Sequence, residues 1–443
     1  MNMGGCESGK ITRREALSKM GRFTAGAAAA SILGQLGCDA SDQNTRRPNI
    51  ILIVADDLGY GDPGCYGGTL CDTPNLDKMA HEGVRLTDFY VSTPVCAPTR
   101  VSLMTGKFPQ RTSLPNIPDY KNPKAGLSPD ETTIAELLRK VGYHTGLVGK
   151  WHLGYAPKFR PLRQGFDEFY GFLSGWLDYN KHTYNDETKW MFRNDEPFDE
   201  PGYTTDLFTR EAISFIDRHK NQPFFLYLPY NAPHEPLEAP EEWMKRSRNG
   251  VYGAVVACMD DSIGKVLNRI KEHGLDDNTL VIFMSDNGND GKGTNAPLQG
   301  QKRELWEGGI RVPAIIRWPG HIPAGEVVRE PIISMDWFNT IAGAAGVCIP
   351  KSLNVDGKDI LPVLKDKKKS PHDIIFWQFF NQSAVRQGEF KLLREENKPD
   401  RLFNLVKDLG EKNDLAAKNP ALAKKLSAAL DKWLKELKGN SYG

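Results

Sequence analysis

The sequence predicts an α/β fold: a large, mostly parallel sheet sandwiched by helices, with a small C-terminal subdomain of antiparallel sheet plus helix. Two observations support this. Short apolar, β-branched runs alternate with amphipathic helical segments through most of the chain, which is typical of a parallel sheet. From about residue 371 the pattern changes to short strands with tight connections. We therefore expect a large domain, big enough to be the catalytic domain of an enzyme, over residues 46–370. A small C-terminal subdomain should follow over residues 371–443.

Each element of the large domain follows from its apolar pattern. The continuous apolar run at 50–55 predicts a strand buried on both faces, whereas residues 132–143 have apolar side chains at helical spacing. By the same criteria the later elements are a strand within 144–154, a helix at 206–219, a strand at 223–234, a helix at 253–274, a strand at 279–288 and a strand within 312–320.

The C-terminal region reads "DIIFWQF", "SAVRQGEFKLL" and "RLFNL", which predict short antiparallel strands. The sequence "PALAKKLSAALDKWLKELK" then predicts an amphipathic closing helix.

The first 40 residues predict an export signal. Arg13 and Arg14 precede a short Gly/Ala-rich apolar stretch, as in a twin-arginine signal; an amphipathic N-terminal helix is the alternative. The stretch ends in "QLGC", which is similar to a lipoprotein cleavage box with Cys38 as the lipidated residue. We expect an exported protein, either released into the periplasm or lipid-anchored in the bacterial envelope.

The composition excludes some functions. The 443 residues include 57 basic and 56 acidic side chains, so there is no basic surplus to indicate nucleic-acid binding. An anionic substrate must then be bound by a local cluster of charge. Cys65 and Cys71 are close enough in sequence to pair, but no CxxC motif indicates zinc.

Polar residues follow four of the predicted strands. In open α/β sheets ligands bind beyond the carboxyl ends of the strands, so these residues predict a shared site. They are Asp56, Asp57, Lys150, His152, His234, Asp286 and Asn287. Helix caps and turns are the alternative at any one position.

The carboxylates and the amide in this set offer only hard oxygen donors, which suit calcium or magnesium, and a flexible cage favours calcium. Alternatively, Asp57 caps a helix and Asp286 and Asn287 form a turn. Two lysines and two histidines supply the opposite charge and proton chemistry: Lys150, Lys302, His152 and His234.

Cys96 lies in "VCAPTRVSLMTG", where Pro98 favours the first turn of a helix. A cysteine at a helix start is expected to have a lowered pKa, and Arg100 would lie one turn on, on the same side. A buried structural cysteine is the alternative.

The run Cys-x-Pro-x-Arg followed by Thr-Gly resembles the signature of the type I sulfatases, which have an alkaline-phosphatase-like fold. The resemblance covers about residues 47–409 and includes "NIILIVADDLGYGD", "GKWHLG", "PFFLYLPYNAPH", "SDNG" and "EGGIRVPAIIRWPG" in family order. It implies that a separate maturase, acting on the unfolded chain, oxidises Cys96 to Cα-formylglycine, whose hydrate is the nucleophile.

The resemblance also implies a role for each residue. One calcium would be bound by the formylglycine at position 96 and by Asp56, Asp57, Asp286 and Asn287. Arg100 would position and activate the diol, while Lys150 and Lys302 hold the sulfate. His234 or Lys302 would protonate the leaving alcohol, and His152 would assist release of sulfate. The sequence departs from many relatives at Gln299, where they have arginine, which puts substrate contacts of that loop in doubt.

The segment 171–185 is rich in aromatic residues, and Asp178 and His182 within it are candidate sugar contacts. Its pattern resembles the galactose- and N-acetylgalactosamine-sulfate branch of the family; a structural surface loop is the alternative. We therefore expect a sulfated carbohydrate substrate. Two other functions stay open: a phosphate or phosphonate monoester hydrolase of the same fold, and a non-catalytic lipoprotein that binds sulfated glycans.

Overall fold

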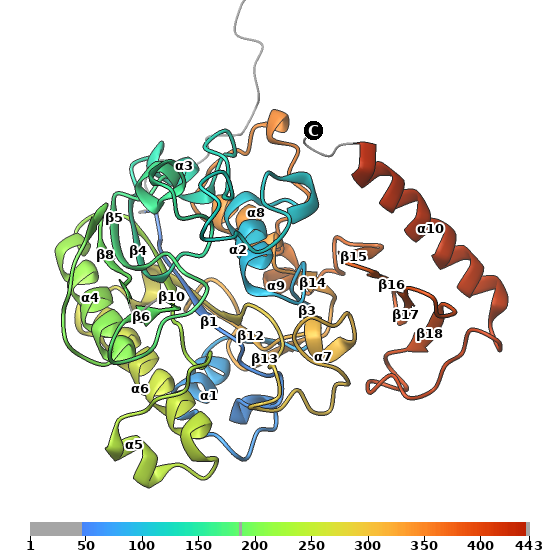
Figure 1. Cartoon of the computed structure of the whole chain (residues 1–443), viewed down its shortest axis with the longest axis horizontal. Helices are drawn as coiled ribbons and strands as arrows, with labels where there is room; N and C mark the ends of the chain where they lie inside the picture. Colours follow the sequence, from blue (N-terminus) through green and yellow to red (C-terminus); the bar gives the residue numbers. More distant parts are fainter. Residues whose placement is uncertain (1–46, 186–187, 440–443) are drawn as a thin grey trace, which may run out of the picture. The chain divides into compact units, whose positions relative to one another are not determined.

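The computed structural model describes residues 47–185 and 188–439, all of which lie in one unit (Figure 1). The expected export signal, with Arg13, Arg14 and Cys38, lies outside the described residues. Among the described residues no helix is both long and apolar enough to cross a membrane.

A ten-stranded sheet forms the centre of the unit, with strand order β13-β2-β12-β11-β1-β10-β4-β5-β8-β9. Its middle five strands, β11 to β5 in that order, are parallel. They are β1 (Asn49–Ala55), β4 (His144–Lys150), β5 (Glu168–Phe172), β10 (Phe224–Pro229) and β11 (Thr279–Ser285).

The sheet is mostly parallel, as expected, although its outer strands are mixed. At one edge β13 pairs parallel with β2, whereas the pairings of β12 with β11 and β2, of β8 with β5 and of β9 with β8 are antiparallel. The segment expected as a strand within 312–320 is antiparallel to β11. The edge strands are β2 (Val84–Leu86), β8 (Met191–Arg193), β9 (Glu196–Pro197), β12 (Ala314–Arg317) and β13 (Glu326–Val328).

Helices cover both faces of the sheet, which is why β1 is apolar from Ile50 to Ala55, after its polar first residue Asn49. Ile50, Leu52 and Val54 pack into the hydrophobic cluster of α2, α3 and α8, whereas Ile51 and Ile53 pack into that of α1, α4 and α6. The helices are α1 (Pro74–His81), α2 (Cys96–Thr105), α3 (Ile134–Arg139), α4 (Thr204–His219), α5 (Glu241–Arg246), α6 (Gly250–Glu272), α7 (Glu307–Ile310), α8 (Asp336–Ala344) and α9 (Leu361–Asp366).

Helix α3 is shorter than the expected span of 132–143. Thr133 and Glu136 form a capping box that fixes its start. Gly142, with φ of 90°, follows the helix and turns the chain toward β4.

The expected C-terminal sheet is present as β15 (Ile375–Phe379), β16 (Gln382–Gln387), β17 (Phe390–Glu395) and β18 (Arg401–Asn404), all antiparallel. Helix α10 (Pro420–Gly439) packs on it through a hydrophobic cluster of its own that includes Leu426, Leu430 and Trp433. The exact boundary at residue 371 stays a prediction. Two small sheets pair β3 (Phe89–Tyr90) with β14 (Ile332–Ile333) and β6 (Thr183–Tyr184) with β7 (Thr188–Lys189).

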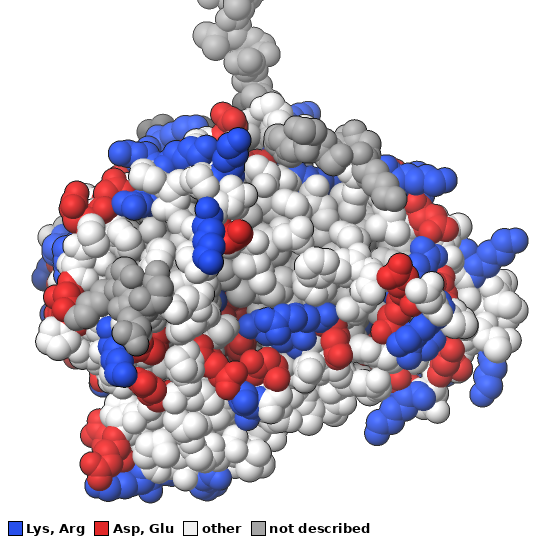
Figure 2. All heavy atoms as spheres, viewed as in Figure 1, with Lys and Arg blue, Asp and Glu red and all other residues white. Residues whose placement is uncertain are grey.

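Basic and acidic side chains are interspersed over the face shown in Figure 2, in keeping with their near-equal numbers in the sequence. Charge does accumulate inside the unit, where the parallel strands end.

Candidate active site

The carboxyl ends of β1 and β11 bring four oxygen-bearing side chains together, as the sequence predicts. Ala55 and Ser285 are register partners, so the residues that follow them meet. The Asp57 amide donates to Asp286 Oδ1 at 3.2 Å, and Asn287 Nδ2 donates to Asp57 Oδ1 at 2.6 Å. Asp56 lies beside them, and all four residues are buried.

Each of the three buried carboxylates is paired with one buried cation. Lys150 Nζ is 2.5 Å from Asp56 Oδ2, and Lys302 Nζ donates to Asp57 Oδ2 at 2.7 Å. Asp286 Oδ2 accepts from Arg100 Nε at 3.1 Å and from its terminal NH2 at 2.7 Å. A buried charge is costly unless an opposite charge pairs with it, and in this cluster each buried carboxylate has such a partner. The three cations come from α2, β4 and the loop before α7.

The pKa values of the carboxylates reflect this crowding. Burial alone would raise the pKa of Asp57, but His234 and Lys302 hold it well below its ordinary value. At Asp286, burial and the negative charge of Asp56 raise the pKa to about 6, although Arg100 opposes them. Crowded carboxylates of this kind favour a bound cation.

The donor set fits the calcium predicted from the sequence. Among the described residues, the buried atoms Asp56 Oδ1 and Asn287 Oδ1 have no hydrogen-bond partner. Asp56, Asp57 and His234 also offer ligand atoms within 4.8 Å of one another. Carboxylate and amide oxygens are the ligands that calcium prefers.

Cys96 is the first residue of α2, as expected, and it is buried, as in the alternative interpretation. Its thiol interacts electrostatically with Lys150, Lys302, Asp56 and Asp286, so it faces the charged cluster. The expectation of a lowered pKa is wrong: burial raises the pKa of the thiol and outweighs the two lysines. An unmodified Cys96 would therefore be a poor nucleophile at neutral pH.

Two histidines border the cluster. His152 follows β4 with φ of 58°, and its Nδ1 has no hydrogen-bond partner among the described residues. Burial, with Lys150 and Arg100, lowers its pKa well below the ordinary value. His234 Nε2 is 3.6 Å from Asp57 Oδ2, and burial lowers its pKa to about 4 against the influence of Asp57.

The proton at neutral pH therefore resides on Lys302 rather than on either histidine. Burial would lower the pKa of Lys302, but Asp57 and Cys96 raise it above its ordinary value.

Asp178 and His182 are engaged within their own loop. The Asp178 carboxylate accepts from the backbone amides of Lys181, His182 and Thr183. His182 Nε2 is 2.9 Å from the carbonyl of Gly202. Both side chains are buried, so these contacts favour the structural alternative over direct sugar contacts.

An aromatic cluster that was not singled out from the sequence includes Trp176, the chain neighbour of Gly175. A Cβ on Gly175 would lie 2.7 Å from His152 Nε2, so this loop packs directly on the histidine. The ring of Trp176 is 4.9 Å from that of Tyr184, which in turn lies 5.5 Å from both Tyr120 and Trp190 (centroid distances). Trp176 and Tyr184 lie within the aromatic-rich segment 171–185, whereas Tyr120 and Trp190 lie outside it and carried no sequence signal.

Asn289 is a second residue that the sequence did not reveal. Its Nδ2 donates to the carbonyl of Asp57 at 2.7 Å, and its carbonyl accepts from the Lys302 amide at 3.1 Å. Asn289 thus links the backbone at Asp57 to the backbone at Lys302, the two residues that form one of the buried ion pairs. Its place just after "SDNG" is the only sequence signal.

Comparison with known proteins agrees with this geometry. Residues 48–347 match the family described as Sulfatase, and residues 300–440 match the family described as N-sulphoglucosamine sulphohydrolase, C-terminal. The chain belongs to the sulfatase family. This sulfatase is therefore a sulfuric ester hydrolase of α/β fold.

Individual relatives are similar over most of their length. The N-acetylgalactosamine-6-sulfatase of Mus musculus is 38% identical over 82% of this chain and 74% of its own. The steryl-sulfatase of Homo sapiens is 34% identical over 76% of this chain and 73% of its own. The crystal structure of Ps i-CgsB in complex with k-i-k-neocarrahexaose is 36% identical, with a TM-score of 0.83 over 88% of this chain and 93% of that one.

Of the remaining cysteines, Cys65 and Cys71 are both free, so the pairing considered from their spacing does not form.

Proposed function

We propose that this sulfatase hydrolyses O-sulfate esters of a carbohydrate, with Cys96 oxidised to formylglycine and calcium bound at Asp56, Asp57, Asp286 and Asn287. The observation that carries the proposal is the position of Cys96. It starts α2 where three buried carboxylates and three buried cations converge, yet its own thiol is not disposed to ionise.

Conversion of Cys96 to formylglycine would resolve this difficulty. One hydroxyl of the hydrated aldehyde attacks the sulfur, and the ester S–O bond breaks as the alcohol leaves with a proton. The second hydroxyl then loses its proton, the bond between carbon and the sulfate oxygen breaks, and the aldehyde re-forms for hydration by water. Because Cys96 is buried, a maturase would have to act before the chain folds.

The chain's own groups have distinct roles in these steps. Arg100, fixed by Asp286, orients the nucleophile at the start of its own helix. Lys150 and Lys302 hold the sulfate oxygens, and Lys302 carries the proton for the leaving alcohol, although its raised pKa makes it a weak acid while Asp57 is its partner. His152, neutral and with Nδ1 unbonded among the described residues, accepts the proton when sulfate is released. Calcium would supply Lewis-acid stabilisation of charge on the reacting oxygens.

Charge favours a sulfate over a phosphate ester. The three carboxylates and three cations balance one another, so a bound divalent cation leaves the site with a surplus suited to a sulfate monoanion and an ionising diol. A phosphate monoester carries two negative charges, so it would neutralise the positive charge of the site and leave none to stabilise the ionised nucleophile.

Two observations support a carbohydrate substrate. The relatives named above include an N-acetylgalactosamine-6-sulfatase and a structure solved with a neocarrahexaose. In addition, the partly exposed rings of Trp176, Tyr120 and Trp190 offer faces on which sugar rings stack. We place galactose and N-acetylgalactosamine sulfates first among the candidates, and we propose that the enzyme acts after export, in the periplasm or anchored through Cys38.

Hydrolysis of a defined substrate panel tests the proposal. Protein made with a formylglycine-generating maturase should release sulfate from sulfated galactose or N-acetylgalactosamine saccharides faster than from steryl sulfate, and should leave aryl phosphates intact. The Cys96→Ala variant should fold but release no sulfate. Mass spectrometry of the peptide that contains residue 96 must show formylglycine; an active preparation with only cysteine there would disprove the mechanism.

A further inference from the structure

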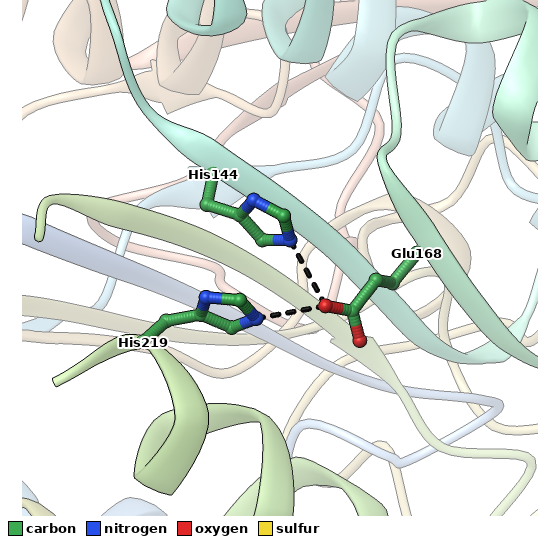
Figure 3. A group of neighbouring side chains, drawn as sticks. All are labelled: His144, Glu168 and His219. Atoms are coloured by element: carbon green, nitrogen blue, oxygen red, sulfur yellow. Dashed lines mark hydrogen bonds and ion pairs between the residues drawn. The ribbon is translucent and has the colours of Figure 1, made fainter.

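A second cluster of side chains that can bind a metal lies at the amino ends of the parallel strands, opposite the candidate active site. His144 is the first residue of β4, Glu168 the first of β5, and His219 the last of α4 (Figure 3). Strand β4 runs from His144 to Lys150 in seven residues, so this cluster is about 20 Å from the candidate active site. None of the three residues takes part in the proposed sulfatase chemistry.

The two imidazoles converge on one oxygen atom. His144 Nε2 is 2.9 Å and His219 Nε2 is 2.7 Å from Glu168 Oε1. The rings stack with centroids 3.8 Å apart and planes inclined by 19°, which keeps the two Nε2 atoms on the same side. The ligand atoms of all three residues lie within 4.8 Å of one another.

Neighbouring groups orient each member of the cluster. His219 Nδ1 is 2.9 Å from the side-chain amide of Gln222, and His144 Nδ1 is 3.8 Å from Asp167 Oδ2. Arg218 contacts the other oxygen of Glu168 at 2.5 Å, which leaves Oε1 to face the histidines. Contacts to the second ring nitrogen and to the carboxylate are the outer interactions that metal-binding histidines and carboxylates use.

We propose that His144, Glu168 and His219 bind a divalent transition metal, with zinc as the representative ion, at a site distinct from the catalytic calcium. Two imidazole nitrogens and one carboxylate oxygen are a zinc ligand set, whereas calcium prefers oxygen ligands alone. The ion binds between the two Nε2 atoms once the ring protons have moved to Nδ1. At His219 the Gln222 amide, whose nitrogen lies 2.9 Å from Nδ1, then turns its oxygen toward the ring, and at His144 the nearest acceptor is Asp167 Oδ2 at 3.8 Å. Water completes the tetrahedron.

The surroundings suit such an ion. Burial lowers the pKa of His219, so its ring is neutral at neutral pH and its nitrogen is available. Burial alone would raise the pKa of Glu168, but hydrogen bonds from His219, Arg218 and His144 lower it, so the carboxylate is ionised. A cavity of about 180 Å³ is lined in part by Glu168 and Arg218, so the carboxylate borders open space on one side.

The bound ion would cross-link β4, β5 and α4 at the amino ends of the strands. Because it binds only the folded chain, zinc should raise the thermal midpoint of unfolding in proportion to the logarithm of its concentration. A triad held by hydrogen bonds alone would give no such dependence.

Zinc titration of the purified full chain in excess calcium tests the site. Calorimetry should show one equivalent of zinc that calcium does not displace, and zinc should raise the thermal midpoint. His144→Ala and His219→Ala should each weaken zinc binding by at least about a hundredfold, since even outer contacts contribute about ten- to a hundredfold. Circular dichroism checks that the variants fold, and His219→Gln, which keeps an amide near Glu168, serves if the alanine variant does not.

His273→Ala is the matched control. His273 Nε2 is 2.6 Å from Asp217 Oδ1, so it is also a histidine paired with a carboxylate, but among the described residues no second histidine shares that oxygen. This variant should bind zinc like the unmodified chain. Equal zinc binding with and without His144 and His219, or no zinc retained by the unmodified chain, would overturn the proposal. An anomalous zinc signal between the two Nε2 atoms would support it.

Discussion

Glu411 should make the stability of this protein depend on pH. Lys391 Nζ is 2.9 Å from Glu307 Oε1 and 2.9 Å from Glu411 Oε1, so two buried carboxylates share one ammonium group. Glu307 also contacts the Tyr90 hydroxyl at 2.6 Å and Arg311 at 3.3 Å. Glu307 therefore has more partners that stabilise its negative charge, and the proton belongs on Glu411.

The pKa values follow this division. Burial would raise the pKa of Glu307, but Lys391 and Arg311 lower it to about 2. Burial raises the pKa of Glu411 to about 7, with Glu307 adding to the effect and Lys391 opposing it. Between the ordinary value of 4.5 and about 7, the folded chain binds more protons than the unfolded chain. The contribution of protonated Glu411 to the free energy of unfolding is thus fully present below pH 4.5, and it is lost as pH rises toward 7.

Glu411→Gln should remove this loss, because glutamine resembles the protonated acid. The difference between 4.5 and about 7 corresponds to about 3 kcal/mol. For a folded unit of this size that is roughly 3–4 °C in the thermal midpoint. The variant should melt within about 1 °C of the unmodified chain at pH 5 and roughly 3–4 °C higher at pH 8.5.

Thermal midpoints measured from pH 5 to 8.5 provide the assay. Taking the difference between variant and unmodified chain cancels the contribution of every other titrating group. Glu396→Gln, which replaces an exposed carboxylate of the same C-terminal sheet region, should show no pH-dependent difference. Parallel midpoint curves for Glu411→Gln and the unmodified chain would refute the assignment of the proton to Glu411.

Other substitutions test the active site and export. Asp286→Asn should abolish stoichiometric calcium in metal analysis and lower kcat by at least about a hundredfold; calcium retained with full activity would contradict the ligand set. Gly175→Ala should lower kcat by about tenfold or more with little change in melting, because the new Cβ would lie 2.7 Å from His152 Nε2 and displace the ring; unchanged kinetics would show that the ring position is unimportant. Replacing Arg13 and Arg14 together by lysine should leave active enzyme in the cytoplasm on cell fractionation, and unchanged periplasmic activity would count against the twin-arginine interpretation.

The sequence could predict the centre of the fold and the composition of the site for one physical reason. A strand buried on both faces is apolar throughout, so the polar residues after Ala55 and Ser285 mark the points where strands leave the core. Parallel strands end at one edge, and residues distant in sequence therefore meet there. Asp57 and Asp286, which lie in contact, could be placed together on that argument alone.

The rest depended on information that apolar patterns do not carry. The run at Ala314–Arg317 is buried like the central strands, and nothing in its composition specifies that it runs antiparallel to β11. At Asp178 and His182 the residue types were right for sugar binding, but nearby backbone groups satisfy both side chains. Burial also reversed the expected pKa of Cys96, because desolvation outweighed the helix start and the lysines.

The cluster of His144, Glu168 and His219 could not be predicted from apolar patterns and the residues that follow them. The rule that ligands bind at the carboxyl ends of strands directs attention to Lys150 at one end of β4 and ignores His144 at the other. His144 and Glu168 look like ordinary polar residues at strand starts, and His219 like a favourable residue at a helix end. Only the pairing of β4 with β5 and the packing of α4 place their ligand atoms together. The two ends of one strand thus carry different chemistry, and only the end that the rule describes could be found without the structure.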